Sequence, residues 1–375
     1  MRFAAINISP LRGLLTIMSY PAGILVVLCV LLGAVCTQSF AQTSGSTQTQ
    51  SLDSQIRAEI SPFKGKVFVF AKNLDTGQTY SYNGDERVRT ASTIKIAVMI
   101  EAFARVAEGR AKWTDELVLT KVARYSGSGI LPEMSDGLRL SLQDCVRLMM
   151  LLSDNTATNM VLDYLGTDAV NERMNSLGFK STRIMRRVGG GGESKEGKLP
   201  DNKRFGLGAT TPHEMVDILE KLDRGQIVNE ATSKEMIDLM KREQGRYAIG
   251  RTIPETTVAT KYGALDALRS CIGIVYSKQG KIAMAITVDE MPAVNWTVDN
   301  AGYLMISRLS LMLSEGLGSR SAPARRSSLR LVSHMSACSR YTLVRTCHRR
   351  SEGIRTDHLD TRNHRAFGPG LTVAD

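Results

Sequence analysis

Strand-like segments occur in two groups separated by a long helical block, and this order constrains the fold more than any other feature. The first group runs from Val67 to Gly84, with the turn residues Asp75–Gly77 between two strands. The second group consists of the segments 257–262, 267–276 and 281–288. A last helix is expected from Val298 to Leu313.

Strands that lie far apart in the chain must still pair to bury their apolar faces. The sequence therefore predicts an α/β (α+β) fold with one antiparallel sheet flanked by helices. A mostly helical lobe, about residues 92–222, is expected to be inserted between the second and third strands of this sheet.

One helix in this block is predicted to be buried on all sides. The segment from Ile94 to Val106 is apolar nearly all the way round and is closed by Gly109. Ser141 and Thr211 open two further helices with capping patterns, the second with Pro212 at the first helical position.

The N-terminal residues 1–41 are typical of a signal peptide. Arg2 and Arg12 precede an apolar run from Pro21 to Cys36, and Ser39-Phe40-Ala41 supplies a small-residue cleavage site. An uncleaved anchor is the alternative, but sixteen apolar residues fall short of the roughly 18 to 20 that span a bilayer. We expect an exported protein, periplasmic or secreted, that meets the membrane only through this segment.

The net charge of +11 lies mostly outside the body of the chain. A polar linker, residues 42–50, precedes a body at 51–317, and the tail at 318–375 carries +7 with eleven arginines and no lysine. All 16 lysines belong to the body, so the tail is a compositional break and is expected to be a disordered extension. A basic arm that binds phosphates is the alternative, and we expect no nucleic-acid partner.

Only two of the six cysteines, Cys145 and Cys271, lie in the body. An exported domain permits a bridge between them, but each lies in an apolar pattern that favours a buried free thiol. No cysteine-rich metal spacing occurs, and the sequence predicts neither a metal nor another cofactor.

A serine nucleophile requires a base, and the body offers a single histidine, His213, within a capped helix start. A Ser-His-Asp triad is therefore disfavoured. Lys95 follows Ser92 by one helical turn on the same helix face, and a lysine whose pKa is lowered by burial can serve as the base. Free N–H groups at the helix start favour the oxyanion that forms during attack on a carbonyl.

Three motifs occur in order along the chain. Ser92-Thr93-Ile94-Lys95 opens the buried helix, Ser153-Asp154-Asn155 lies between two helices, and Lys261-Tyr262-Gly263 lies on a strand. Ser-x-x-Lys alone means little, because Ser61-Pro62-Phe63-Lys64 also matches it. The ordered set, with the segments 126–131 and 151–159, resembles the class A β-lactamases of the β-lactamase and penicillin-binding-protein superfamily over about residues 52–316.

The resemblance implies a role for each matching residue. Ser92 would be acylated, Lys95 would act as base, Ser153 would relay a proton to the leaving nitrogen, and Asn155 would hold the substrate. Lys261 and Gly263 belong to the strand motif that binds substrate, where the lysine would hold a substrate carboxylate. The backbone N–H groups of Ser92 and Ala264 would form the oxyanion hole.

The chain departs from the family pattern at two points. Tyr262 stands where the family usually has a short hydroxyl residue that contacts the substrate carboxylate, so substrate scope is expected to change. The family's deacylating glutamate lies in a Glu-x-x-Leu-Asn loop, which this chain lacks. Glu196, in Glu196-Gly197-Lys198-Leu199-Pro200, is the nearest match, and Glu193 competes with it.

These features predict a monomeric serine β-lactamase that hydrolyses the lactam amide through an acyl-enzyme on Ser92. Its substrate would be a small β-lactam or a peptidoglycan peptide. The alternatives are a D,D-peptidase or penicillin-binding enzyme with slow deacylation, and a non-catalytic domain that binds lactams or wall fragments as a sensor.

Overall fold

The computed structural model describes residues 51–253 and 258–318. The expected signal peptide at 1–41, the linker at 42–50 and residues 319–375 of the expected tail lie outside the described residues. Thr257, the first residue of one expected strand, lies outside them too.

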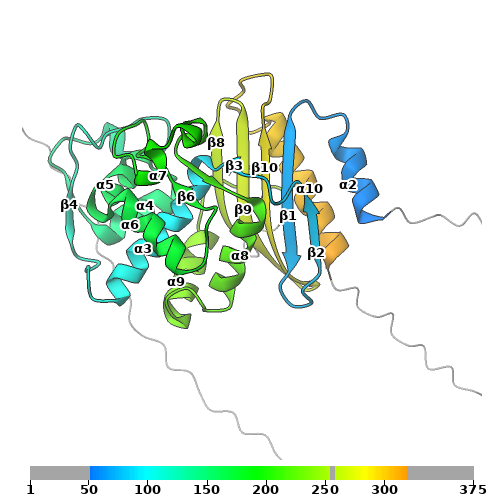
Figure 1. The fold of residues 1–375 in the computed structure, drawn as a ribbon, viewed down its shortest axis with the longest axis horizontal. Coiled ribbons are helices and arrows are strands. Elements are labelled where there is room, and N and C mark those ends of the chain that lie inside the picture. The colour runs from blue at the N-terminus through cyan, green and yellow to red at the C-terminus, as the bar shows by residue number, and fades with distance from the viewer. Residues whose placement is uncertain (1–50, 254–257, 319–375) are drawn as a thin grey trace, which may run out of the picture. The chain divides into compact units, whose positions relative to one another are not determined.

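The predicted antiparallel sheet is present and has five strands in the order β2-β1-β10-β9-β8 (Figure 1). Its strands are β1 (Lys66–Asn73), β2 (Thr79–Tyr82), β8 (Val258–Leu265), β9 (Leu268–Ser277) and β10 (Gly280–Asp289). Phe70 lies opposite Ala285, and Tyr262 lies opposite Cys271. The first two strands thus pair with strands that follow about 180 residues later in the chain, as the order of segments predicts.

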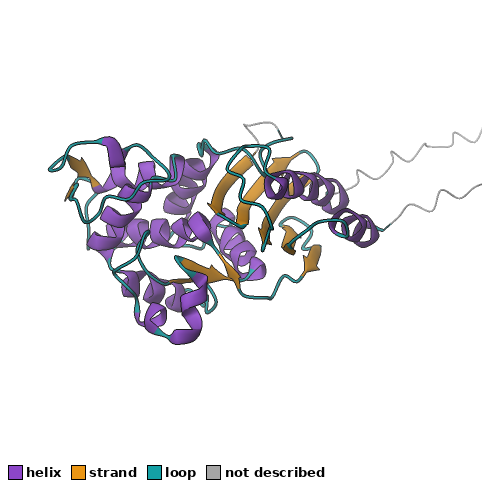
Figure 2. Ribbon diagram, turned by 90° about the horizontal axis from the view of Figure 1, so that it is seen from above, coloured by secondary structure: helices purple, strands orange, loops and turns teal. Residues whose placement is uncertain are grey.

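The helices divide between the sheet and a helical lobe. The long helices are α2 (Leu52–Ile60), α3 (Lys95–Ala107), α4 (Leu142–Leu151), α5 (Asn155–Leu165), α6 (Thr167–Ser176), α8 (Pro212–Asp223), α9 (Glu230–Lys241) and α10 (Ala301–Leu317). Helices α10 and α2 lie together on one side of the sheet, and α8 packs on β1 and β10 (Figures 1 and 2). The helical segment continues through α9, past the residue 222 that was expected to end it.

Short elements complete the described part of the chain. These are the 3-10 helices η1 (Ala91–Ile94), η2 (Leu131–Glu133) and η3 (Pro200–Phe205), the one-turn helix α7 (Lys195–Lys198), and the strands β3 (Val88–Arg89), β4 (Glu116–Val118), β5 (Arg139–Ser141), β6 (Arg183–Ile184) and β7 (Gly208–Thr210). Strand β7 pairs with both β3 and β6 in a second, three-stranded sheet. Because β3 lies just before η1, this sheet ties the segment that precedes Ser92 to β6 and β7.

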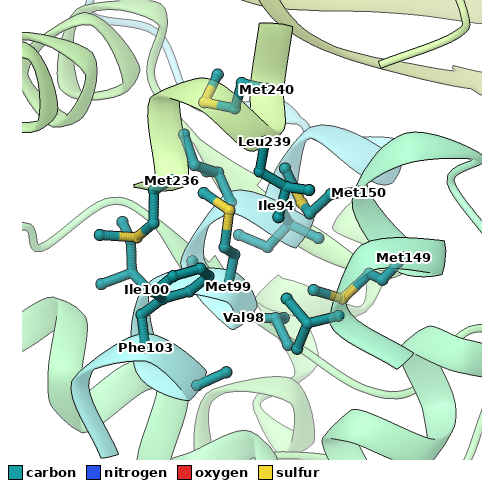
Figure 3. Packing of buried hydrophobic residues seen from close by; sticks show 14 of the residues in the cluster. Ile94, Val98, Met99, Ile100, Phe103, Met149, Met150, Met236, Leu239 and Met240 are labelled. Atoms are coloured by element: carbon teal, nitrogen blue, oxygen red, sulfur yellow. The ribbon is translucent and has the colours of Figure 1, made fainter. Parts of the chain in front are cut away.

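The buried helix predicted after Ser92 is α3, whose residues from Lys95 to Ala104 are all buried. Its apolar side chains pack between methionine-rich faces of α4 and α9, as Figure 3 shows for Met149 and Met236. A second apolar cluster fills the space between the sheet and α10. The helix that carries the candidate nucleophile at its start is therefore fixed on several sides.

Cys145 and Cys271 are both buried free thiols, as predicted, and burial raises the pKa of each to about 12. Helix α10 begins at Ala301, three residues after Val298, because the Asn300 side chain accepts a hydrogen bond from the N–H of Gly302 and caps the helix there.

No helix within residues 51–253 and 258–318 is long and apolar enough to cross a membrane. Within the same residues, no group of three or more His, Cys, Asp or Glu side chains is placed to hold a metal ion.

Candidate active site

Ser92 lies in the tight turn η1, immediately before α3, and is half-buried. The residue before it, Ala91, has a φ of 45°, a left-handed conformation that is uncommon for a residue with a Cβ. Backbone strain of this kind tends to persist where the surrounding structure requires it and is frequent at functional sites. In this protein the strained residue lies where the chain turns from β3 into η1, immediately before Ser92.

Lys95 is fully buried and points at the Ser153 motif. Its Nζ lies within hydrogen-bond distance of three oxygens: the backbone oxygen of Ser153 at 2.6 Å, Ser153 Oγ at 3.2 Å and Asn155 Oδ1 at 3.1 Å. Burial, and then the positive charge of Lys261, lower the pKa of Lys95 well below its usual value, although Asp154 and Glu243 oppose the shift. These conditions favour the neutral amine that a general base requires.

Asp154 joins the Ser153 motif to the loop at 125–131. One carboxylate oxygen caps α5 by accepting from Ala157 N at 2.8 Å, and the other accepts from the N–H groups of Ile130 and Leu131 at 2.7 and 2.9 Å. Gly129 lies so close that a Cβ at this position would overlap the carboxylate. The Ser-Asp-Asn motif and the glycine-rich loop therefore form one bonded unit.

Asn155 is held by the same loop, because its Nδ2 donates to Ser126 O at 2.9 Å and its backbone N–H donates to Ser128 O at 3.0 Å. Its Oδ1 faces Lys95. Ser153 itself has a φ of 54°. The site therefore contains a second residue in the left-handed conformation, in addition to Ala91.

Strand β8 brings the third motif against the nucleophile. Gly263 lies so near η1 that a Cβ there would meet Ser92 N at 2.7 Å and Thr90 O at 2.8 Å, so only glycine fits. Because β8 is an edge strand, alternate N–H groups point out of the sheet. The N–H of Tyr262 points outward to Glu243 at 3.1 Å, so that of Ala264, two residues on, also faces outward, as an oxyanion hole requires.

Lys261 forms a buried ion pair that the sequence did not predict. Its Nζ lies 2.5 Å from Glu243 Oε1, both side chains are completely buried, and Nζ also donates to Tyr262 O at 3.0 Å. Burial raises the pKa of Glu243, an effect that the charge of Lys261 opposes. No local pattern marks Glu243, which follows a charged helix end, so its role depends on tertiary structure.

A cleft of about 780 Å³ brings the motifs together. Five of the predicted residues line it: Ser92, Ser153, Asn155, Tyr262 and Ala264. The other motif residues lie behind the lining of the cleft. Lys95 and Lys261 are fully buried there, and Gly263 packs against the turn that carries Ser92.

The two candidate deacylating glutamates lie elsewhere. Neither Glu196 nor Glu193 is among the residues that line the cleft, and the Glu196 carboxylate accepts from Asn202 Nδ2 at 3.2 Å. Val188 lines the cleft instead, held by a hydrogen bond from its N–H to Asn159 Oδ1 at 2.9 Å. The loop therefore contributes Arg186, Val188 and Gly189 to the lining of the cleft, and neither candidate glutamate.

Comparison with known proteins identifies the family. The chain matches the β-lactamase enzyme family over residues 51–317. It belongs to this family. The β-lactamase AER-1 of Aeromonas hydrophila is 26% identical over 300 residues, which cover 76% of this chain and 93% of AER-1. The β-lactamase CARB-4 of Pseudomonas aeruginosa is 27% identical over 259 residues, which cover 68% of this chain and 86% of CARB-4.

Solved structures agree. A β-lactamase from Sphaerobacter thermophilus is 28% identical with a TM-score of 0.62, and the match covers 71% of this chain and 96% of that one. A structure named PBP-A is 25% identical with a TM-score of 0.61, covering 70% of this chain and 94% of that one. The predicted fold and the prediction of a serine hydrolase of the β-lactamase type are confirmed.

Proposed function

We propose that this member of the β-lactamase family opens β-lactams by acylating Ser92 and then hydrolyses the ester. The observation that carries the proposal is the convergence of Ser92, Ser153 and Asn155 in one cleft, with the buried Lys95 amine bonded to the last two. Lys95 follows Ser92 by one helical turn, and its lowered pKa suits the role of the base that activates a serine nucleophile.

The reaction can be assigned to these residues in steps. Neutral Lys95 takes the proton of Ser92 Oγ as this oxygen attacks the lactam carbonyl carbon. The N–H groups of Ser92 and Ala264 stabilise the oxyanion, and removal of one such donor typically costs about a hundredfold to a thousandfold in rate. The carbon–nitrogen bond then breaks, and the Ser153 hydroxyl passes the proton from Lys95 to the leaving nitrogen.

Hydrolysis of the ester needs a base for the attacking water. Under this proposal Glu196 supplies it, with Glu193 as the alternative, and either side chain would have to reach the cleft in the acyl-enzyme. Glu196→Gln should then leave acylation intact and trap the adduct, whereas Glu193→Gln is the matched control. Unchanged steady-state turnover in Glu196→Gln would exclude Glu196 as the base.

A second function is favoured by Val188. An aliphatic residue in the cleft, with both glutamates outside its lining, supports a penicillin-binding enzyme or D,D-peptidase that is acylated but releases lactams slowly. The likeness to PBP-A is in keeping with this reading.

One experiment separates the two functions. The purified protein is mixed with a chromogenic cephalosporin, and colour and protein mass are followed together. Sustained turnover supports the β-lactamase. A single stoichiometric burst with a stable adduct supports the slow enzyme, and in that case Val188→Glu should shorten the adduct's lifetime while Val188→Leu should not.

We further propose that the protein is exported as a monomer after cleavage behind Ala41, which would place its activity where β-lactams meet the cell wall. Expression of the full chain should yield a processed form that begins at Gln42. An intact N-terminus on the exported protein would contradict this cleavage.

A further inference from the structure

Besides Tyr125, four aromatic side chains line the same cleft as Ser92, and the proposed reaction uses none of them as a chemical group. They are Tyr247, Tyr262, Trp296 and Tyr303. They come from three separate parts of the chain: Tyr247 from the loop after α9, Tyr262 from strand β8, and the other two from α10 and the segment that precedes it. We call this set the aromatic wall.

The wall is a packed unit. The rings of Tyr247 and Tyr262 meet edge to face with centroids 5.8 Å apart, and Tyr247 lies at the same distance from Tyr303. The Tyr262 ring also covers Gly245, where a Cβ would overlap it. Edge-to-face aromatic pairs are favourable arrangements, so the rings are held in place before any ligand binds.

Arg269 connects Trp296 to the wall. Its guanidinium carbon lies 4.9 Å from the Trp296 ring centroid and 5.0 Å from that of Tyr303. The fully buried side chain donates to Leu268 O at 2.7 Å and also to Asn295 O, next to the tryptophan. The arginine thus links the loop that carries Trp296 to the rest of the wall.

Trp296 remains 61% exposed, and Val298, which also lines the cleft, is exposed as well. Large apolar side chains that gather at the mouth of a cleft commonly mark a binding surface. Lys261, which the family resemblance assigns to the substrate carboxylate, instead forms a buried ion pair with Glu243. The cations nearest the rings, Lys261 and Arg269, are both fully buried, so the surface that the wall presents to the cleft is aromatic.

We propose that the aromatic wall is a specificity subsite that binds an aromatic or other planar apolar substituent of the acylating substrate. The inference rests on the proposed function, since it names the kind of β-lactam that the Ser92 site prefers. It also gives Tyr262 a role: the phenol replaces a short hydroxyl and contributes a ring face to the subsite.

Rate measurements with matched substrates test this proposal. Two pairs of β-lactams are needed, and the two members of a pair share the same bicyclic nucleus but carry either a phenyl or a methyl substituent. In the first pair the substituent lies on the acylamino side chain, and in the second it lies on the ring fused to the lactam. The acylation rate constants should favour the phenyl member in at least one pair. Trp296→Ala should reduce that preference about tenfold, which corresponds to ~1.4 kcal/mol, and Trp296→Phe should retain most of it.

Val294→Ala is the matched control, because Val294 belongs to the same loop and is similarly exposed at 64% but does not line the cleft. Tyr247→Leu is a second variant that should also lower the preference. The proposal is overturned if Trp296→Ala and Tyr247→Leu leave the preference unchanged in both pairs. It is also overturned if they slow both members of each pair equally, which would indicate a purely structural role.

A binding measurement separates this proposal from acylation itself. The chain has two tryptophans, so Trp113→Phe leaves Trp296 as the sole tryptophan, whose emission can be excited selectively over that of the tyrosines. In a Ser92→Ala background, the phenyl β-lactams should change its emission and bind more tightly than their methyl partners. Absence of any acylation in the wild-type protein would contradict the proposed function, whereas an unchanged emission would contradict the subsite.

Discussion

Among single residues, Lys95 matters most for the proposed chemistry, because it would serve as the base that activates Ser92. The amine is fully buried and shares its surroundings with Lys261, and both conditions disfavour the charged form. A lowered pKa means that the unfolded chain binds a proton that the folded protein has lost. Stability should therefore rise with pH between the lowered pKa and the ordinary value of 10.5, while the neutral base stays available at lower pH than usual.

We expect the acylation rate constant to fall as the pH decreases through the lowered pKa of Lys95, because the protonated amine cannot accept the proton of Ser92. Lys95→Arg keeps a cation that does not deprotonate and should slow acylation by about a hundredfold or more. Acylation measured across a pH series checks both expectations. A Lys95→Arg protein that is acylated at the wild-type rate would exclude Lys95 as the base.

The Glu243–Lys261 pair permits a stability prediction. Glu243→Gln leaves a buried ammonium without its counter-charge, which should lower the free energy of unfolding by about 3 to 5 kcal/mol. Replacing both partners, as Glu243→Gln with Lys261→Met, removes the unpaired charge and should recover part of the loss. Chemical denaturation of the two single variants and the double variant measures this coupling. Additive losses would show that the pair is not coupled.

Sequence reasoning reached some of these residues and missed others for a physical reason. Ser92, Lys95 and Ser153 stand in short motifs whose local geometry is largely set by helix starts. Glu243 and Val188 become relevant only because tertiary packing brings them to Lys261 and to the cleft. No spacing along the chain encodes those contacts.

At the scale of elements, the loop at 125–131 is positioned by Asp154 through hydrogen bonds to its backbone. The sequence predicted the strands and the buried helix to within a few residues, because apolar periodicity decides them. It did not predict that Ser92 lies in a 3-10 turn before α3, since a turn of this kind depends on the left-handed conformation of Ala91.

Gly129 tests the loop's attachment. Gly129→Ala would place a Cβ on the Asp154 carboxylate in addition to straining a φ of 95°. Gly137→Ala is the control, because its φ of 83° is equally unfavourable but the space around it is open. We expect Gly137→Ala to cost about 1 to 2 kcal/mol with acylation unchanged, and Gly129→Ala to cost more and to slow acylation. Equal effects of the two substitutions would contradict the role of the close contact.

At the scale of the whole molecule, the family match ends at residue 317, which is also the end of α10. The compositional break at the basic tail begins at the next residue. The architecture followed from the order of strand and helix patterns because distant apolar strands have few ways to be buried. The sequence does not predict whether the acyl-enzyme is hydrolysed quickly or slowly. That rate depends on which side chain of the loop faces the cleft.

A chain that ends at Leu317 should keep the melting temperature and the acylation rate of the full-length protein, because the tail is expected to contribute no part of the domain. Thermal unfolding and adduct formation of the two proteins, compared side by side, check this. A clear loss of either property on truncation would show that residues 318–375 belong to the functional unit.

The central claim is that Ser92 is the residue that a β-lactam acylates, and intact-protein mass followed by peptide mapping tests it most directly. After brief exposure to a penicillin, the wild-type protein should gain the mass of one lactam on the peptide that contains Ser92, and Ser92→Ala should gain none. An adduct that persists in Ser92→Ala, or a wild-type protein that forms no adduct at any concentration, would contradict the account.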